Sequence, residues 1–238
     1  MLLHLVLAVV AIGAVIGIAY LVCYGGFEGP VDWAMHTSSH GSRDARQIAL
    51  TFDDGPDPER TPAMLDALAA LDVKATFFVL GSSVDAHPEL CARILREGHE
   101  LGNHTYHHRY LPLTRSRDVE RELVATDLAI LRATGTVPTI ARPPYGGRSP
   151  WTVRAFARVA KRLVLWDINS FDWKGAPSDD VARRVLDQAR PGSIILMHDA
   201  RRGRAGKKPS TTVEAVRLLV PELQARGYDL VTVSHLAA

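Results

Sequence analysis

Cysteine is scarce in this 238-residue sequence, which contains only Cys23 and Cys91. Cys23 lies inside an apolar segment, so no disulfide framework is expected to hold the remaining chain together. Neither sign of charge dominates, because 28 basic and 26 acidic residues are mixed along the chain and leave a formal net charge of +2. This balance excludes an extended nucleic-acid-binding surface. A hydrophobic content of 47% and a charged content of 23% predict one globular domain with an appendage.

Charged side chains are also missing from the first part of the chain, since no Asp, Glu, Lys or Arg occurs at 2–24. An uncharged apolar run of this length predicts a transmembrane helix. A cleaved signal peptide is disfavoured, because the start lacks basic residues and no small-residue cleavage site follows. We therefore expect a transmembrane anchor at 1–24, a linker rich in Gly, Ser, His and Pro at 25–43, and a main domain at 44–238. The basic cluster at 201–208 is typical of a solvated loop, and contact with an anionic cell-wall polymer or lipid headgroup is the alternative.

Strand-like and helix-like segments alternate through the main domain. β-rich runs occur at 47–52, 75–80, 99–103, 139–142, 163–169, 193–197 and 229–233. Helical patterns occur between them, at 62–71, 88–97, 117–133, 150–160, 179–189 and 212–226. This alternation predicts a parallel sheet covered by helices, which either closes into a barrel or stays open. In such folds the functional residues gather beyond the carboxyl ends of the strands.

Polar side chains follow the predicted strands at that end. Two carboxylates follow the first strand, two imidazoles follow the third, and an arginine, an aspartate and a histidine follow the next three. These residues are Asp53, Asp54, His104, His108, Arg142, Asp172 and His198. A random scatter of such residues would not respect strand ends so consistently, so we expect one site.

Three of these motifs, taken singly, have ordinary structural explanations. The Asp-Asp-Gly-Pro segment at 53–56 is favourable in turns, the Arg-Pro-Pro-Tyr-Gly segment at 142–146 is a loop stiffened by prolines, and a histidine that ends a buried strand, such as His198, is often structural. The functional interpretation gives one aspartate to a metal ion and the other to proton transfer. In this interpretation, the two prolines before Tyr145 stiffen the backbone and hold Tyr145 in a fixed direction.

The histidine pair His104 and His108 has the spacing of metal ligands. The two histidines are four positions apart in the sequence, a spacing that places both imidazoles on one side of a helical turn. Such pairs also arise by chance among ten histidines, and His107 competes with His108 as a ligand. Two histidines and one carboxylate leave open positions on a metal ion, as in catalytic sites, where a bound water has a pKa of about 7.

Taken together and in this order, these motifs resemble the polysaccharide deacetylases of carbohydrate esterase family four, the NodB homology domain. The resemblance spans about Gln47 to Val233 and includes the segments Val73–Val79 and 227–233. It implies an α/β fold, a distorted and incomplete (β/α) barrel of about seven parallel strands, preceded here by the N-terminal transmembrane helix.

The resemblance assigns roles around a metal ion. Asp53 would be the general base, and Asp54, His104 and His108 would be the metal ligands. Arg142 would orient Asp53. Zinc (Zn2+) is the usual ion of the family, and Co2+, Mn2+ or Ni2+ could replace it.

The remaining motifs would form the substrate pocket and the acid. Tyr145 would line the groove and stabilise the oxyanion through its backbone N–H. Trp173 would form a wall of the acetyl pocket, and Leu196 would pack against the acetyl methyl group. His198 would donate a proton to the leaving amine, with Asp172 holding its imidazolium form.

The implied function is that of a metal-dependent hydrolase that removes acetyl groups from N-acetylated sugars of a polysaccharide. The anchor would make it a single-pass protein of the cytoplasmic membrane, with the catalytic domain on the extracytoplasmic side. A tethered enzyme reaches peptidoglycan or another envelope glycan more readily than soluble chitin-like chains. Two alternatives remain open, an O-acetyl esterase that uses the same site and a catalytically silent glycan-binding domain.

Overall fold

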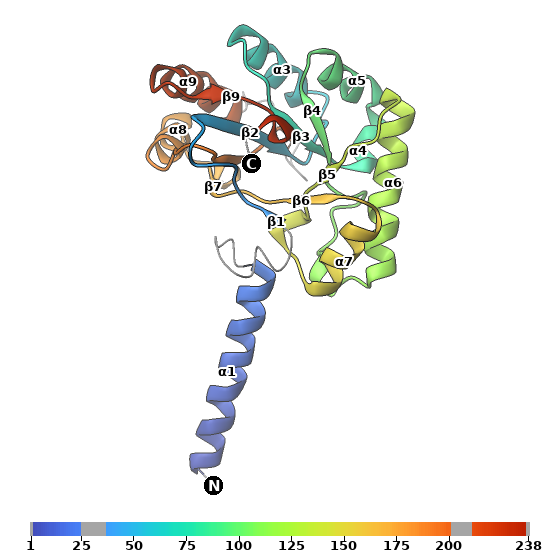
Figure 1. Cartoon of the computed structure of the whole chain (residues 1–238), viewed down its shortest axis with the longest axis vertical. Coiled ribbons are helices and arrows are strands. Elements are labelled where there is room, and N and C mark those ends of the chain that lie inside the picture. The colour runs from blue at the N-terminus through green and yellow to red at the C-terminus, as the bar shows by residue number, and fades with distance from the viewer. Residues whose placement is uncertain (1, 25–36, 201–210, 237–238) are drawn as a thin grey trace.

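The computed structural model describes residues 2–24, 37–200 and 211–236 (Figure 1). Its strands are β1 (Thr37–Ser38), β2 (Gln47–Asp53), β3 (Thr76–Val79), β4 (Glu100–Asn103), β5 (Ile140–Ala141), β6 (Arg162–Val164), β7 (Ile168–Asn169), β8 (Ile194–His198) and β9 (Asp229–Leu230). Its α-helices are α1 (Leu2–Tyr24), α3 (Arg60–Ala70), α4 (Gly81–Ala86), α5 (Pro88–Arg96), α6 (Ser116–Thr134), α7 (Pro150–Arg158), α8 (Ser178–Leu186) and α9 (Thr211–Ala225). Short 3-10 helices are η1 (Leu111–Leu113), η2 (Pro144–Gly146), η3 (Asp172–Lys174) and η4 (Val233–His235). Each helix predicted in the main domain is present, and α4 is an additional short one.

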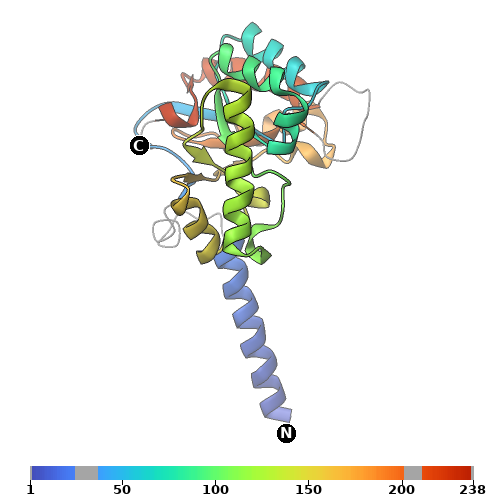
Figure 2. The ribbon, with the colours of Figure 1, turned by 90° about the vertical axis from the view of Figure 1, so that its right-hand side faces the viewer.

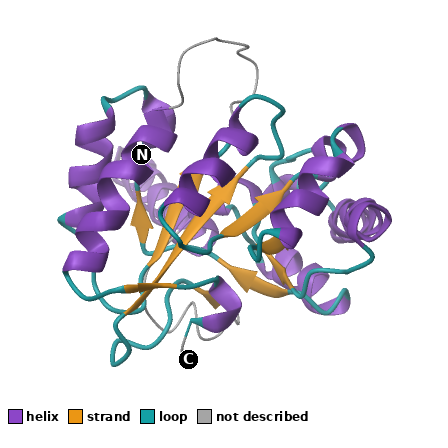
Figure 3. Cartoon of the chain, turned by 90° about the horizontal axis from the view of Figure 1, so that it is seen from above, coloured by secondary structure: helices purple, strands orange, loops and turns teal. Residues whose placement is uncertain are grey.

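The strands form one sheet in the order β1-β6-β5-β4-β3-β2-β8-β7, and β9 pairs with the start of β2. Every pairing between these strands is parallel. Seen from above, helices surround the strands (Figure 3). In the described part of the chain no pairing joins β1 to β7, so the barrel stays open. This confirms the predicted incomplete (β/α) barrel of parallel strands.

The alternation of side chains along β2 decides which of them reach the inside of the barrel. Leu50 and Phe52 belong to the main hydrophobic core, which lies between the sheet and helices α3, α5, α8 and α9. Thr51 and Asp53 therefore face the inside, because successive strand residues point to opposite faces. The neighbouring strand β8 runs in the same register and ends with His198 paired to Asp53. Both strands thus deliver a polar side chain at their carboxyl ends.

The segment 163–169 forms two short strands where the sequence predicts one. β6 pairs with β5 and β1, whereas β7 pairs with β8. Side chains replace the ladder hydrogen bonds between them. The Leu165 carbonyl accepts a hydrogen bond from Arg142 over 2.8 Å, and the Asp167 carboxylate accepts one from the backbone N–H of Ile194 over 2.8 Å. The strand therefore ends and restarts around these side chains.

Helix α1 forms over the uncharged segment and lies apart from the sheet domain, as Figures 1 and 2 show. The prediction of a transmembrane helix is nevertheless wrong, because no helix within the described residues is long and apolar enough to cross a membrane.

Two further predictions concern residues outside the described part of the chain. The linker expected at 25–43 falls mostly on 25–36, and the basic loop expected at 201–208 falls entirely on such residues. The described end of the linker region contacts the sheet domain. There β1 pairs with β6, and the N–H of Gly41 donates to the carbonyl of Gly192 over 2.8 Å.

The outward face of β3 generates a prediction about stability. Phe77 is fully buried, and its ring centroid lies 5.2 Å from that of Phe52. We expect Phe77→Ala to lower the free energy of unfolding by about 3–5 kcal/mol, because the core cannot refill the cavity. Urea denaturation measures this loss. The control Val137→Ala, at an exposed position, should change stability by less than about 0.5 kcal/mol. Equal effects of the two substitutions would contradict the assignment of this face to the core.

Candidate active site

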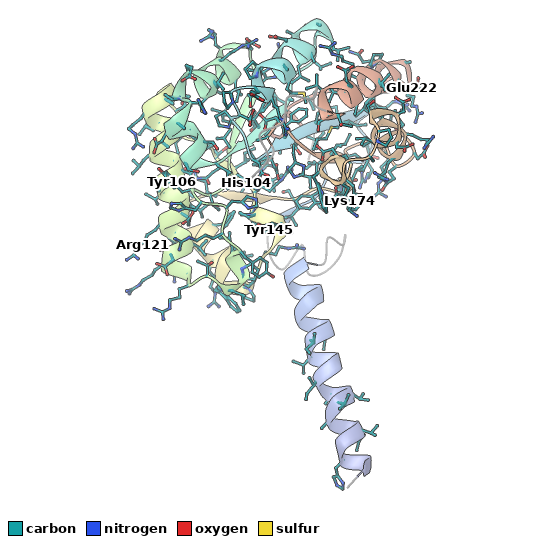
Figure 4. The ribbon with its side chains drawn as sticks, turned by 180° about the vertical axis from the view of Figure 1, so that it is seen from behind. His104, Tyr106, Arg121, Tyr145, Lys174 and Glu222 are labelled. Atoms are coloured by element: carbon teal, nitrogen blue, oxygen red, sulfur yellow. The ribbon has the colours of Figure 1, made fainter. Side chains whose placement is uncertain are left out.

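The carboxyl ends of the strands surround a pocket of about 520 Å³. Its lining residues are Asp53, Asp54, His104, His108, Tyr145, Trp166, Asn169, Trp173, Leu196, His198 and Ala200. Two predicted site residues, Arg142 and Asp172, lie behind this lining and are buried. Figure 4 shows His104 and Tyr145 close together at this end of the domain. The structure therefore brings all of the sequence-predicted site residues together.

The carboxylate of Asp54 lies against two imidazoles. Its Oδ1 is 3.1 Å from Nε2 of His108 and 3.6 Å from Nε2 of His104. Two donor atoms that bind one tetrahedral zinc ion lie about 3.4 Å apart, so these separations fit a shared ion. The Asp54 Oδ1 atom is also buried without a well-aligned hydrogen-bond donor. Asp54, His104 and His108 could accordingly hold a divalent metal.

The protonation of these ligands suits a metal. Nδ1 of His104 lies 2.8 Å from the Arg142 carbonyl, which can only accept, so Nδ1 carries the proton and Nε2 is left as a lone pair. Burial lowers the pKa of His104 to about 4, which keeps its imidazole neutral. Burial on its own raises the pKa of Asp54, but the His108 contact and nearby imidazoles lower it to about 2. Asp54 is therefore anionic and His104 neutral, which are the forms that bind a metal.

His104 and His108 do not lie on a helical turn, contrary to the prediction from their spacing. They belong to the irregular segment that follows β4. The carboxylate of Glu122 in α6 holds this segment by accepting the backbone N–H groups of Tyr106 (3.1 Å) and His107 (2.7 Å). The ligand pair is thus positioned by a neighbouring helix and not by helical periodicity.

His107 does not take part in the ligand trio. Its Nδ1 lies 2.8 Å from Oε1 of Glu122, and 56% of its side chain is exposed. It therefore turns toward α6, whereas His108 turns toward Asp54. This geometry resolves the ambiguity between the two histidines in favour of His108.

Asp53 is held by the buried guanidinium of Arg142. Nη1 of Arg142 donates to Oδ1 of Asp53 (2.7 Å) and to Oγ1 of Thr51 (2.8 Å). The guanidinium also stacks 4.0 Å from the ring centroid of Phe78. The other carboxylate oxygen of Asp53, Oδ2, lies 3.6 Å from Nε2 of His104. One oxygen is consequently fixed while the second borders the metal-ligand trio.

His198 is held by the buried carboxylate of Asp172. Its Nδ1 and its backbone N–H each lie 2.9 Å from a carboxylate oxygen. Burial on its own lowers the pKa of His198, but the hydrogen bond and the charge of Asp172, with two further carboxylates, raise it to about 9. Burial raises the pKa of Asp172, but its contacts with His198 and Thr212 outweigh this and lower it. The pair is therefore a stable imidazolium and carboxylate at neutral pH.

Several residues around the site carry no motif in the sequence. Thr212 in α9 donates to Asp172 over 2.8 Å, and Trp166 lines the pocket beside Arg142, 5.5 Å from its guanidinium. Of the site residues that carry no motif, only Thr51 could be predicted from the sequence. It precedes Asp53 by two residues and so lies on the same face of β2. The others depend on contacts between distant parts of the chain.

Left-handed backbone conformations gather at the loops that carry the site. Asp54 (φ 78°), Thr105 (φ 68°), His108 (φ 58°), Tyr145 (φ 60°) and Phe171 (φ 53°) all have positive φ. Such conformations cost about 1–2 kcal/mol for residues other than glycine. The surrounding packing must therefore hold these loops in place.

A base candidate, an acid candidate and a set of metal ligands thus face one pocket, which is the set of groups that hydrolysis of an acyl bond requires. A family model described as polysaccharide deacetylase matches residues 31–164, more than half of the chain. The chain belongs to the polysaccharide deacetylase family. This confirms the resemblance on which the fold expectation rests.

Curated relatives of this chain have names that refer to different glycans. A peptidoglycan-N-acetylglucosamine deacetylase of Bacillus cereus is 36% identical over 81% of this chain and 68% of its own length. PgdA of Listeria monocytogenes, with the same activity name, is 37% identical, but the match covers only 39% of its length. A chitooligosaccharide deacetylase of Rhizobium leguminosarum is 38% identical over 79% of this chain and 90% of its own length.

Solved structures share the fold as well as the sequence. A peptidoglycan N-acetylglucosamine deacetylase superposes with a TM-score of 0.81 at 33% identity, over 88% of this chain and 97% of that one. A family 4 acetyl xylan esterase of Clostridium thermocellum, in complex with a cobalt ion, superposes with a TM-score of 0.73 at 34% identity, over 80% and 89% of the two chains.

The geometry of the ligand trio predicts where a metal binds. We expect His104→Ala to weaken zinc binding strongly, because it removes one of three donors, whereas His107→Ala should leave the affinity nearly unchanged. Isothermal titration of both variants with zinc measures the difference. Equal affinities of the two variants would contradict the assignment of His104 and not His107 to the trio.

The raised pKa of His198 predicts a dependence on Asp172. The imidazolium is present below about pH 9 and is lost as the pH rises through that value. Asp172→Asn removes the negative charge and leaves burial to lower the pKa, so the imidazolium should be lost at a lower pH. NMR titration of the His198 ring measures the shift. Asp180→Asn, an exposed carboxylate on α8, is the control, and identical titrations of the two variants would refute the coupling.

Proposed function

We propose that the protein hydrolyses the acetamide group of N-acetylated sugars in a polysaccharide. The observation that carries the proposal is the meeting of three systems in one pocket. These are the Arg142-bound carboxylate of Asp53, the Asp172-bound imidazole of His198, and the trio of metal-ligand side chains. Together they supply the base, the acid and the Lewis-acid site that amide hydrolysis needs.

Asp54, His104 and His108 would hold the metal. Two imidazoles and one carboxylate suit zinc, and cobalt, manganese and nickel accept similar donors. A bound ion supplies a water of lowered pKa and polarises the acetyl carbonyl. The related acetyl xylan esterase was solved in complex with a cobalt ion, which supports the use of a divalent metal.

Asp53 acts as the general base in this proposal. Arg142 fixes its Oδ1, so Oδ2 is the oxygen that faces the ligand trio and can take a proton from the attacking water. Because the guanidinium is fully buried, it also excludes solvent from the back of the carboxylate. The base is therefore oriented before the substrate binds.

His198 acts as the general acid. Its Nδ1 donates to Asp172, and in the imidazolium form Nε2 carries a second proton that is available to the leaving amine. The raised pKa keeps this nitrogen protonated at neutral pH. When the carbon–nitrogen bond breaks, the amine takes the proton and the imidazole becomes neutral.

Three further side chains shape the space for the acetyl group. Leu196 is buried and lines the pocket. It precedes His198 by two residues on β8, so both side chains lie on the same face, and it would contact the methyl group. Trp173 is 52% exposed and would form a wall of the groove. Tyr145 is 60% exposed, and its backbone N–H would stabilise the oxyanion.

A second hollow supports a polymeric substrate. It has a volume of about 320 Å³ and shares Asp54 and Ala200 with the main pocket. Ser82, Ser83 and His87 add polar groups to its lining. Two hollows that meet at Asp54 suit a chain of sugars better than a small amide. Among polymers we favour peptidoglycan, which the names of two relatives support, and this substrate implies action outside the cytoplasmic membrane.

De-O-acetylation is the second candidate function. The acetyl xylan esterase shares the fold at 34% identity, and an ester differs from an amide only in its leaving group. An alcohol leaves more readily than an amine and needs less help from an acid. The His198 and Asp172 pair therefore favours the amide, and it also argues against a catalytically silent binding domain.

The assignment of Asp53 as base predicts the outcome of one substitution. We expect Asp53→Asn to reduce acetate release from peptidoglycan by at least ~100-fold while zinc binding persists, because the ligand trio remains intact. Chelation of the metal should abolish release in the wild type, and added zinc should restore it. Acetate is measured enzymatically.

The matched control is Asp66→Asn, which alters an exposed carboxylate of α3 that pairs with Arg93. It should retain wild-type activity. Full activity of Asp53→Asn would refute its role as base. Release from acetylxylan but not from any N-acetylated glycan would replace the proposal by the esterase.

A further inference from the structure

Two cations flank the aromatic ring of Phe171 at the edge of the active-site pocket. Nζ of Lys174 lies 4.2 Å from the ring centroid of Phe171, and the guanidinium carbon of Arg184 lies 5.6 Å from it. Arg184 also donates to the carbonyl of Ser170 over 2.9 Å. Lys174 and Arg184, called the cation pair below, are therefore held in place by the chain and do not simply extend into solvent.

No carboxylate neutralises the cation pair in the described part of the chain. The ion pairs of the neighbouring helix α8 involve Arg183, whose guanidinium binds Asp180. Among the described residues, Nζ of Lys174 has no ion-pair partner and lies over the rings of Phe171 and Trp173. The two cations therefore leave a local excess of positive charge, with donors that a ligand can use.

The cation pair borders the groove through Trp173. Nζ of Lys174 lies 5.3 Å from the ring centroid of Trp173, which lines the pocket. The backbone N–H of Phe171 is bound by Asn169, which also lines the pocket. Figure 4 shows Lys174 on the same side of the domain as Tyr145. A substituent on a sugar bound against Trp173 can thus reach the cations.

We propose that the cation pair binds a carboxylate on the glycan and so selects anionic over neutral polysaccharides. The proposal rests on the proposed deacetylase function and adds the charge class of the substrate. A neutral chain of N-acetylglucosamine has no group that pairs with these cations. Peptidoglycan presents such a group in either of two forms: the carboxylates of its stem peptides or, where a stem peptide has been removed, the freed lactyl carboxylate of the muramoyl sugar.

The expected size of the effect follows from exposure. Lys174 is exposed, so its attraction for a carboxylate is partly screened by water and by salt. Screened pairs of this kind change affinity by up to about 5-fold. The effect should appear mainly in KM, because the cation pair lies outside the group of residues that touch the acetyl group.

The test compares three substrates with wild-type protein and Lys174→Gln, using the full chain loaded with zinc. The substrates are chitotetraose, glycan strands whose stem peptides have been removed by an amidase, and intact muropeptides. Lys174→Gln should raise KM by about 2- to 5-fold for the carboxylate-bearing substrates and by less than ~1.5-fold for chitotetraose. A rise in KM for the stripped strands would show binding of the lactyl carboxylate, and a rise for the intact muropeptides would show binding of the stem-peptide carboxylates.

Two controls separate recognition from structural damage. Arg183→Gln removes a neighbouring cation of α8 that already has a carboxylate partner, and it should leave all three KM values unchanged. Lys174→Arg keeps the charge and should keep the preference. Raising the ionic strength from ~0.05 M to ~0.5 M should weaken the wild-type preference, because salt screens exposed charges.

The outcomes are distinct. A rise in KM by the same factor for chitotetraose and for the anionic glycans, or no rise for any of them, would overturn the proposal. Absence of acetate release from every substrate by the wild type would instead overturn the deacetylase function itself.

Discussion

The buried guanidinium of Arg142 is the interaction on which the rest of the site depends. An unpaired charge inside the barrel would cost several kcal/mol, so the structure surrounds it with acceptors. Its side chain fixes Asp53 and Thr51 on β2 and binds the carbonyl of Leu165, which directly follows β6. Its own carbonyl fixes the tautomer of His104. The position of the base and the chemistry of a metal ligand therefore follow from one residue.

Much of this arrangement can be predicted from local patterns. Parallel strands end at one edge of the sheet, so the residues that follow the runs at 47–52 and 193–197 must meet there, as Asp53 and His198 do. The alternation within each strand also separates the side chains that pack on helices from those that reach the site. For these reasons the barrel and its polar end follow from the sequence without any knowledge of tertiary contacts.

The features that could not be predicted depend on partners far along the chain. The segment that carries His104 and His108 takes its shape from Glu122 in α6, and residue spacing contains no trace of that contact. The break between β6 and β7 arises where Asp167 replaces a ladder bond to the next strand. The predicted transmembrane helix is not supported, because no helix of the described residues is long and apolar enough to cross a membrane.

The left-handed residues of the site loops have a consequence for protein engineering. Asp54, His108 and Tyr145 would not point where they do if their backbones relaxed into the ordinary right-handed or extended regions. Transplanting the functional side chains onto another parallel barrel would therefore not transplant the reactivity. A designer would have to copy whole loops together with the helix and strand contacts that keep their backbones in the left-handed conformation. This makes the site difficult to move between scaffolds.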